Sequence, residues 1–151
     1  GFGNGWAWDL CIFTYRYPGS YPGGFTRPDT DELYGALSWK IASLKYSYSL
    51  GDTFGVADSD GTDYIDLSLA VPIKGVTLTL HGGHQRYTGD ANGALFSYTD
   101  WKAELSKGWN GGWSAGAGYT GTDAEPAGYT PASTGRFIGE DQVYAIVRRT
   151  F

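Results

Sequence analysis

Histidine, serine and aspartate could do chemistry in this chain, and the two histidines are the first to consider. His81 and His84 are the only histidines of the 151 residues and are three positions apart. In a strand this spacing puts the two rings on opposite faces, so we expect no joint metal site. A lipid hydrolase or acyltransferase would need one of them beside a serine and an aspartate. Both residue types are abundant enough to match by chance, so we predict no enzyme and no catalytic residue.

A second candidate is the acidic segment 58–63, whose oxygen-rich side chains surround a glycine as in a calcium loop. It lacks the third early ligand and the bidentate glutamate of an EF-hand. We therefore interpret Asp58, Asp60 and Asp63 as acids of a solvated outer loop, and predict no metal and no cofactor. Cys11 is the only cysteine, which excludes a disulfide scaffold and favours a small buried side chain.

The elements that must position these residues follow a period of two. With 24 glycines, 12 tyrosines, 7 phenylalanines and 6 tryptophans, the composition favours strands and turns over helices. No run of about 18 apolar residues occurs, which excludes a membrane-spanning helix. Eight alternating runs of about nine to eleven residues occur instead, long enough to cross a bilayer at a tilt. They are Trp6–Tyr17, Glu32–Lys40, Ala42–Leu50, Asp63–Val71, Val76–Arg86, Tyr98–Lys107, Trp113–Thr122 and Gln142–Phe151.

The connections between the runs alternate in length. Tight turns are expected at 40–42, 72–75 and 108–112, and long glycine-rich loops at 18–31, 51–62, 88–97 and 123–141. All the tight turns then lie at one end of the sheet and all the long loops at the other, as in transmembrane β-barrels. We expect all six prolines to fall between the runs, and both chain ends to lie at the tight-turn end.

Charge follows the same axis. The loop end is rich in acids, with only Arg27 and Arg136 against them, while Lys40, Lys74, Lys107, Arg148 and Arg149 stand near the tight turns and the C-terminus. The acids of the loop end are Asp29, Asp31, Asp52, Asp58, Asp60, Asp63, Asp90, Asp123, Glu125, Glu140 and Asp141.

The two faces of the runs decide between a soluble and a membrane barrel. One face carries small residues with charges of both signs, which suits a crowded polar interior where each charge has a partner. Its predicted lumen-lining residues are Asp9, Glu32, Lys45, Asp66, Asp100, Lys102, Glu104 and Arg148. The other face is apolar, with aromatic girdles at the two ends. The girdle residues are Trp6, Trp39, Trp109, Trp113 and Phe151 near the tight turns, and Tyr48, Trp101 and Tyr119 near the loops. A lipocalin-like barrel with these aromatics in its core is the alternative.

Four stretches resemble a known family. They are 5–10 with 15–19, Lys45-Tyr46-Ser47-Tyr48-Ser49, Tyr98-Thr99-Asp100-Trp101, and the ending in Phe151. Along nearly the whole chain the sequence is similar to the TorF family of outer-membrane porins. The resemblance implies an outer-membrane β-barrel of a Gram-negative bacterium, with a C-terminal strand that the barrel-assembly machinery recognises. Members of that family have additional strands before the part matched here.

These patterns together predict a single domain over 1–151, an all-β, antiparallel up-and-down transmembrane β-barrel with eight strands in this chain and more in a longer parent. The absence of an initiator methionine and of a leader indicates a mature or truncated start at Gly1. A net charge of −5 disfavours nucleic acid as a partner, so the expected partners are the lipid bilayer and lipopolysaccharide.

We expect a porin that passes small polar solutes or ions by passive diffusion. Eight strands leave an interior that side chains fill, whereas a wider barrel would be lined by the same charges. A closed structural or interaction barrel with acidic outer loops is therefore the alternative, and a membrane-barrel lipid enzyme is the third. The solute and the oligomeric state stay open at this point.

Overall fold

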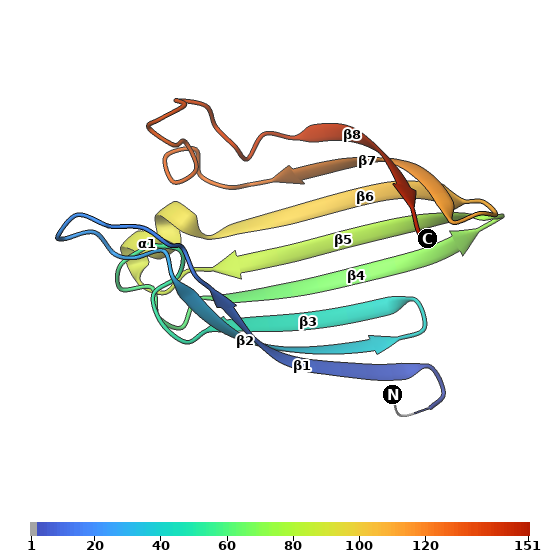
Figure 1. Cartoon of the computed structure of the whole chain (residues 1–151), viewed down its shortest axis with the longest axis horizontal. Coiled ribbons are helices and arrows are strands. Elements are labelled where there is room, and N and C mark those ends of the chain that lie inside the picture. The colour runs from blue at the N-terminus through green and yellow to red at the C-terminus, as the bar shows by residue number, and fades with distance from the viewer. Residues whose placement is uncertain (1–2) are drawn as a thin grey trace.

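The computed structural model describes residues 3–151, which form one antiparallel sheet of eight strands in chain order (Figure 1). The strands are β1 (Trp6–Tyr15), β2 (Thr30–Trp39), β3 (Ala42–Ser49), β4 (Asp63–Ile73), β5 (Val76–Arg86), β6 (Tyr98–Gly108), β7 (Trp113–Thr122) and β8 (Gln142–Arg149). The predicted all-β, up-and-down order is confirmed. The sheet is not closed, because β1 and β8 each pair with one neighbour only.

The strand boundaries agree with the alternating runs, with one error concerning proline. Pro72 lies inside β4, opposite Thr77 of β5, and not between strands. The amide of Ala70, two residues earlier, donates to Ile41 in the β2–β3 turn, 2.7 Å away. The next backbone nitrogen of β4 that points toward β3 is that of Pro72, and it lies beyond the end of β3. The missing donor therefore faces no partner strand, as proline in a sheet requires.

The tight turns and both ends of the described chain lie at one end of the sheet, and the long loops at the other, as predicted (Figure 1). The β4–β5 turn shows why so few residues suffice there. Lys74 and Gly75 both have positive φ, 49° and 86°, as a two-residue type I′ hairpin turn requires. The turn matches the right-handed twist of the strands and fixes their register.

The expected irregular loop 88–97 instead contains a short helix, α1 (Asp90–Phe96). The carboxylate of Asp90 in the first turn stabilises the helix by its attraction to the positive end of the helix dipole, but Gly93 is a weak helix former. Contacts with other loops hold it: Asn92 donates to the Ala57 carbonyl over 2.9 Å, and the Tyr129 hydroxyl donates to the Phe96 carbonyl over 2.6 Å. No helix among residues 3–151 is long and apolar enough to span a membrane.

The sheet has its polar side chains shielded and its apolar side chains exposed. In β3, Ser47 and Ser49 are buried while their neighbours Tyr46 and Tyr48 are exposed. Ala124 is the only buried hydrophobic residue among those described. The other buried side chains are polar: Thr30, Ser47, Ser49, Thr53, Ser59, Thr62, Asp63 and Glu104. The lipocalin-like alternative is therefore wrong for this sheet, because the aromatic and aliphatic residues do not form its core.

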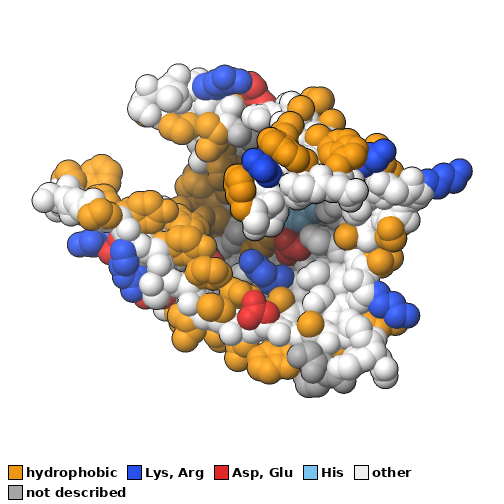
Figure 2. Space-filling view, turned by 45° about the vertical axis from the view of Figure 1, so that its right-hand side comes forward, with side chains coloured by type: hydrophobic (Ala, Val, Ile, Leu, Met, Phe, Trp, Pro, Cys, Tyr) orange, Lys and Arg blue, Asp and Glu red, His pale blue; other side chains and the backbone are white. Residues whose placement is uncertain are grey.

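The sheet curves around the polar side, which we call the concave face; the apolar side is the convex face. Figure 2 shows charged and histidine side chains inside the hollow. On the convex face Leu10 is 63% exposed and Val143 is 83% exposed. The register carries each face across the sheet, because residues directly opposite in paired strands point to the same side.

Candidate functional site

A hydrogen-bonded group around His81 lies near the middle of the concave face. His81 Nε2 is 2.7 Å from Asp100 Oδ1, and His81 Nδ1 is 3.3 Å from Asp66 Oδ2. Ser68 Oγ donates to Asp66 over 3.1 Å and is 3.3 Å from His81 Nδ1. Tyr64 donates its hydroxyl proton to Asp100 Oδ2 over 2.9 Å. Both nitrogens of one imidazole therefore face carboxylates that come from different strands.

Tyr64 reaches Asp100 by crossing a whole strand. It belongs to β4 and Asp100 to β6, with Gly83 of β5 between them in the sheet. A Cβ at Gly83 would lie 2.8 Å from Asp100 Oδ2 and would overlap the Tyr64 hydroxyl. The glycine is thus what lets the phenol ring lie flat across β5.

The same arrangement recurs on the other side of β6. Tyr144 of β8 crosses Gly118 of β7 and donates to Glu104 Oε2 over 2.8 Å. A Cβ at Gly118 would be 2.6 Å from the Tyr144 hydroxyl. Arg148 Nη1 lies 3.6 Å from Glu104 Oε1. Glu104 is only 7% exposed, so its charge is held by a phenol and a guanidinium rather than by bulk water.

A third tyrosine organises the β1 side of the concave face. Tyr34 of β2 donates to Asp9 Oδ2 over 2.6 Å, and Lys45 Nζ lies 4.9 Å from the centre of the same ring. Cys11 is opposite Tyr34 in the register, on the polar side as predicted, but it is half-buried and not buried as expected.

The structure places all eight predicted lumen-lining residues on the concave face. Asp66 and Asp100 meet at His81, Glu104 meets Arg148, and Asp9 and Lys45 meet at Tyr34. Glu32 and Lys102 share the face by register, Glu32 opposite Ser49 and Lys102 opposite His81. The common face is a fact of the fold, while the role of these side chains in lining a lumen stays a prediction.

The girdle residues at the tight-turn end are associated with basic side chains. Trp6 and Trp39 stack with ring centres 5.6 Å apart, and Lys40 Nζ lies 4.5 Å from the Trp39 ring centre. Lys107 lies over Trp109, at 5.9 Å. Arg149, the one base on the apolar side of β8, lies over Trp113 and Phe151, at 5.2 and 4.6 Å. Such pairs suit a membrane interface, where an indole body is apolar and the cation stays wet.

At the loop end the girdle tyrosines and tryptophan are also exposed on the convex face. Tyr48, Trp101 and Tyr119 are each about two-fifths exposed. The Tyr119 hydroxyl donates to Asp141, the residue directly before β8. That these three rings form a second girdle in contact with lipid stays a prediction.

The loop acids are less uniformly solvated than predicted. Asp58 and Asp60 are exposed, but Asp63 is buried at the start of β4 and paired with Arg86, directly opposite on β5. The interpretation of Asp63 as an outer solvated acid is therefore wrong, because a strand partner neutralises it. Arg16 also pairs with an acid at this end, Asp31, over 2.7 Å.

The segment 51–62 is a folded loop with a polar interior. Ser59 is fully buried: its backbone N–H donates to Asp52 Oδ1 over 3.0 Å, and its hydroxyl accepts from the Thr53 amide over 2.7 Å. Thr62 donates to the Ser59 carbonyl over 2.7 Å. Within residues 3–151 no group of three His, Cys, Asp or Glu side chains could hold a metal ion, and the absence of a metal stays a prediction.

Three groups of the described chain outside the strands have shifted pKa values, and one of them is Tyr129, whose pKa is raised by burial. The Tyr17 backbone N–H donates to Asp29 Oδ1 over 2.9 Å and lowers the pKa of that carboxyl, with Arg27 acting in the same direction. Burial raises the pKa of Tyr87 to about 12, beside Phe96.

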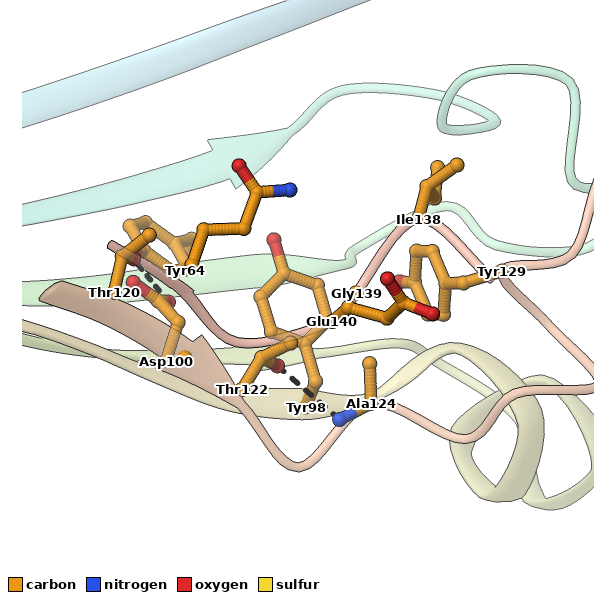
Figure 3. A pocket seen from close by; sticks show the side chains of 12 residues that line it. Tyr64, Tyr98, Asp100, Thr120, Thr122, Ala124, Tyr129, Ile138, Gly139 and Glu140 are labelled. Carbon is orange, nitrogen blue, oxygen red and sulfur yellow. Dashed lines mark hydrogen bonds between the residues drawn. The ribbon is translucent and has the colours of Figure 1, made fainter. Parts of the chain in front are cut away.

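A pocket of about 410 Å³ lies at the loop end, between the concave face and the segment 123–141 (Figure 3). Tyr64 and Asp100 of the His81 group contribute to its lining, together with Tyr98 and Tyr129. Glu140 and Ile138 line it from the β7–β8 loop. The polar network of the strands therefore ends in a cavity that a small molecule could enter.

Residues 1–151 match the family described as "Bacterial protein of unknown function (Gcw_chp)". The chain belongs to the Gcw_chp family. No curated protein and no solved structure shows detectable similarity to it. The description of the Gcw_chp family names no activity, so the resemblance to TorF-family porins stays a prediction.

Sequence reasoning missed the tyrosines that organise the concave face of this Gcw_chp chain. The three tyrosines were not predicted as site residues, although each donates a hydrogen bond to a carboxylate that was predicted to line the lumen. They are Tyr34, Tyr64 and Tyr144. For Tyr64 and Tyr144 the sequence does contain an indication: each is a tyrosine of the polar face next to a glycine of the same face on the neighbouring strand. That indication needs the strand register, which the alternating pattern alone does not provide.

The His81 group differs from a serine triad. In a triad one ring nitrogen faces the nucleophile and the other faces a carboxylate that orients the ring. Here Ser68 and Asp66 share one nitrogen, and Asp66 itself accepts the serine proton. The backbone amides of strands are committed to the sheet and could not stabilise an oxyanion. The structure confirms that His81 and His84 lie on opposite faces, since His84 is opposite Ile65 of the convex face and near Thr99. That the protein is no enzyme stays a prediction.

Proposed function

We propose that this Gcw_chp chain forms a β-barrel in the outer membrane of a Gram-negative bacterium and passes small polar solutes or ions by passive diffusion. One observation carries the proposal: most large apolar side chains of the strands lie on the convex face and are left uncovered, while most charged side chains lie on the concave face, where carboxylates such as that of Glu104 are shielded. In water such a face would be an aggregation hazard, whereas hydrocarbon covers it favourably.

The two free edges belong to the same proposal. Within a bilayer an unpaired strand edge costs several kcal/mol for each polar backbone group, so only closed barrels cross it with strands. We therefore propose that β1 and β8 pair in the membrane, either with each other or with further strands of a longer parent. The first route gives a narrow, filled barrel and the second a wider lumen.

A closed structural barrel is the second candidate, and the crossing tyrosines favour it. Tyr64 and Tyr144 tie strands β4, β6 and β8 together across the concave face and occupy space that a channel would need. In this alternative the charges stiffen the barrel, and the exposed loop acids such as Asp58 and Asp60 meet lipopolysaccharide or protein partners.

Conductance in planar bilayers separates the two candidates. The full chain, folded in detergent, is added to one side of the bilayer, and single-channel steps are recorded at low and high voltage. Stable steps that depend on salt support the porin, and a folded but silent protein supports the closed barrel. The matched variant is Lys102→Ala, which removes a charge of the concave face, with Lys74→Ala in the β4–β5 turn as its control.

A measurement of solubility tests the membrane assignment itself. We expect the protein to need detergent or lipid to remain monodisperse and to show heat-modifiable migration in gels. If it is a monodisperse species in plain buffer, the convex face is not covered by lipid and both barrel proposals fail. An intact mass of the native protein well above 16.3 kDa would favour the wider barrel.

A further inference from the structure

The pocket at the loop end has an unusual lining for a solute-binding cavity on an ion-paired face. Its side chains include three tyrosines, Tyr64, Tyr98 and Tyr129, and two carboxylates, Asp100 and Glu140. The remaining lining residues are neutral, and no lysine, arginine or histidine is among these described residues. A cavity of about 410 Å³ falls within the size range of small-molecule sites.

We propose that this pocket binds a small organic ammonium ion. The proposal goes beyond solute passage, because equilibrium binding in the pocket requires no open channel. Aromatic side chains around a cavity attract an alkylated ammonium through their ring faces, and carboxylates complete the attraction at longer range.

The aromatic part of the pocket is held in place by its own contacts. The rings of Tyr98 and Tyr129 are 5.5 Å apart between centres and nearly perpendicular, at 88°. Tyr129 is fixed by its hydroxyl, which donates to the Phe96 carbonyl over 2.6 Å, and by an edge contact with the Phe96 ring. Figure 3 shows the Tyr98 hydroxyl directed into the cavity. A ligand would thus meet a preformed corner, which lowers the entropy cost of binding.

The charged part of the pocket has two carboxylates on separate elements. Asp100 comes from β6 and Glu140 from the loop before β8, and Figure 3 shows both at the cavity. Asp100 and Asp66 share the single imidazole of His81, so this group keeps a net negative charge in either protonation state of the ring. Lys102 shares the concave face with Asp100 but is absent from the lining.

Glu140 is available to a ligand in spite of its own partner. Its ion pair with Arg136 spans 3.2 Å and both side chains are more than half exposed. Exposed pairs of this kind contribute little free energy, so a cation in the pocket competes with Arg136 at low cost. The pocket thus combines an aromatic corner with a net negative charge, because Asp66, Asp100 and Glu140 outnumber His81 and Arg136, and this favours cations over neutral or anionic solutes of the same size.

Isothermal titration of the full chain, folded in detergent, tests the proposal with choline as the probe. Glucose serves as the neutral probe, acetate as the anionic probe, and sodium chloride as the control for ionic strength. We expect saturable heats with choline and none with the other three at the same concentrations. Equal binding of glucose would overturn the proposal in favour of a sugar site, and no saturable binding of choline would overturn it outright.

Variants then assign the binding to the pocket. Tyr98→Leu should weaken choline binding about tenfold, the change expected when a desolvated cation–π contact is lost, whereas Tyr98→Phe should remain within about threefold of the parent. Glu140→Gln, in an exposed loop, should weaken it without affecting folding. Tyr46→Leu on the convex face is the matched control and should bind as the parent does.

Two results would place the site elsewhere and overturn the proposal: parental affinity in a folded Tyr98→Leu variant, or loss of affinity in Tyr46→Leu. Circular dichroism and gel migration establish that each variant folds. The outcomes are independent of the channel test. A silent barrel that binds choline would refute solute passage and support the pocket, and a conducting one that ignores choline would do the reverse.

Discussion

The concave and convex faces are made by the same strands and differ in whether their side chains find partners within the chain. On the concave face, carboxylates such as Glu104 and Asp100 find phenol, imidazole or guanidinium partners within the chain. On the convex face, Leu10 and Val143 are left uncovered by any part of the described chain. The sheet therefore satisfies its polar side by itself and depends on its surroundings for its apolar side.

A shift of one residue in the strand register would exchange the two faces. Side chains alternate with a period of two, so a slip by one position would put Asp66 on the outside and Leu67 on the inside. The turn at Lys74 and Gly75 and the tyrosine crossings oppose such a slip.

A charge in the middle of the convex face should have the largest effect. Leu67 is about half exposed near the centre of β4, opposite Leu44. We expect Leu67→Arg to destabilise the protein folded in lipid vesicles by about 2–4 kcal/mol, because the guanidinium would lie in hydrocarbon. Urea titration of tryptophan fluorescence measures it. Ile41→Arg, in the β2–β3 turn, is the control and should cost at most about 1 kcal/mol. Equal costs at the two positions would contradict the membrane assignment of the convex face.

A methyl group on the concave face should have the next effect. Gly83→Ala places a Cβ against Asp100 and the Tyr64 hydroxyl, and we expect a loss of about 1–3 kcal/mol from this overpacking. Gly82→Ala is the matched control, because a Cβ there meets nothing within 4 Å. Denaturant unfolding of the two variants, side by side, measures the contrast. The crossing arrangement is wrong if both alanines are tolerated equally.

Removal of one hydroxyl should cost less. Tyr144→Phe leaves the shielded carboxylate of Glu104 with Arg148 alone, and we expect a loss of about 1.5 kcal/mol for the charge-assisted hydrogen bond. Tyr119→Phe removes the bond to Asp141, where both residues are exposed, and should cost less than about 0.5 kcal/mol. A double-mutant cycle with Glu104→Gln isolates the interaction, and a coupling near zero would show that water replaces the phenol.

The smallest effect concerns acid stability at the loop end. Asp29 is accessible to solvent, and its lowered pKa comes first from the Tyr17 amide. A depressed carboxyl pKa stabilises the folded loop above the unfolded pKa of about 3.9, and this contribution is lost as the pH falls through the folded value. We expect Asp29→Asn to flatten the decline of stability below pH 4 slightly. Carboxyl resonances followed by NMR during titration give the pKa directly, and an ordinary value would refute the assigned hydrogen bond.

The sequence predicted the strands well because alternation is a local property. The runs 42–50 and 76–86 agree with β3 and β5 nearly residue for residue, and the common face of Lys45 and Asp66 follows from counting by twos. The long loops were predicted as connections from their glycines and prolines. Their positions were correct for the same local reason.

What could not be predicted depends on contacts between distant segments. Helix α1 contains a glycine and is stabilised through Asn92 and Tyr129, neither of which its own sequence reveals. The burial of Asp63 depends on Arg86 being opposite, which needs the register of β4 with β5. The pocket needs five elements at once: β4, β6, β7, the segment 123–141 and β8. Local patterns carry none of this information.

The order of the strands also bears on how the molecule assembles. Because each strand pairs only with its neighbours in sequence, hairpins can be added one after another, and every step joins segments close along the chain. A seam between β1 and β8 would be the single exception, since it joins the first and last strands of the described sheet. Loop-closure entropy rises by about 0.6 kcal/mol for each doubling of the enclosed length, so that seam is the costliest contact to form and the natural last step. Until it forms, the first and last strands remain open templates on which another chain could grow.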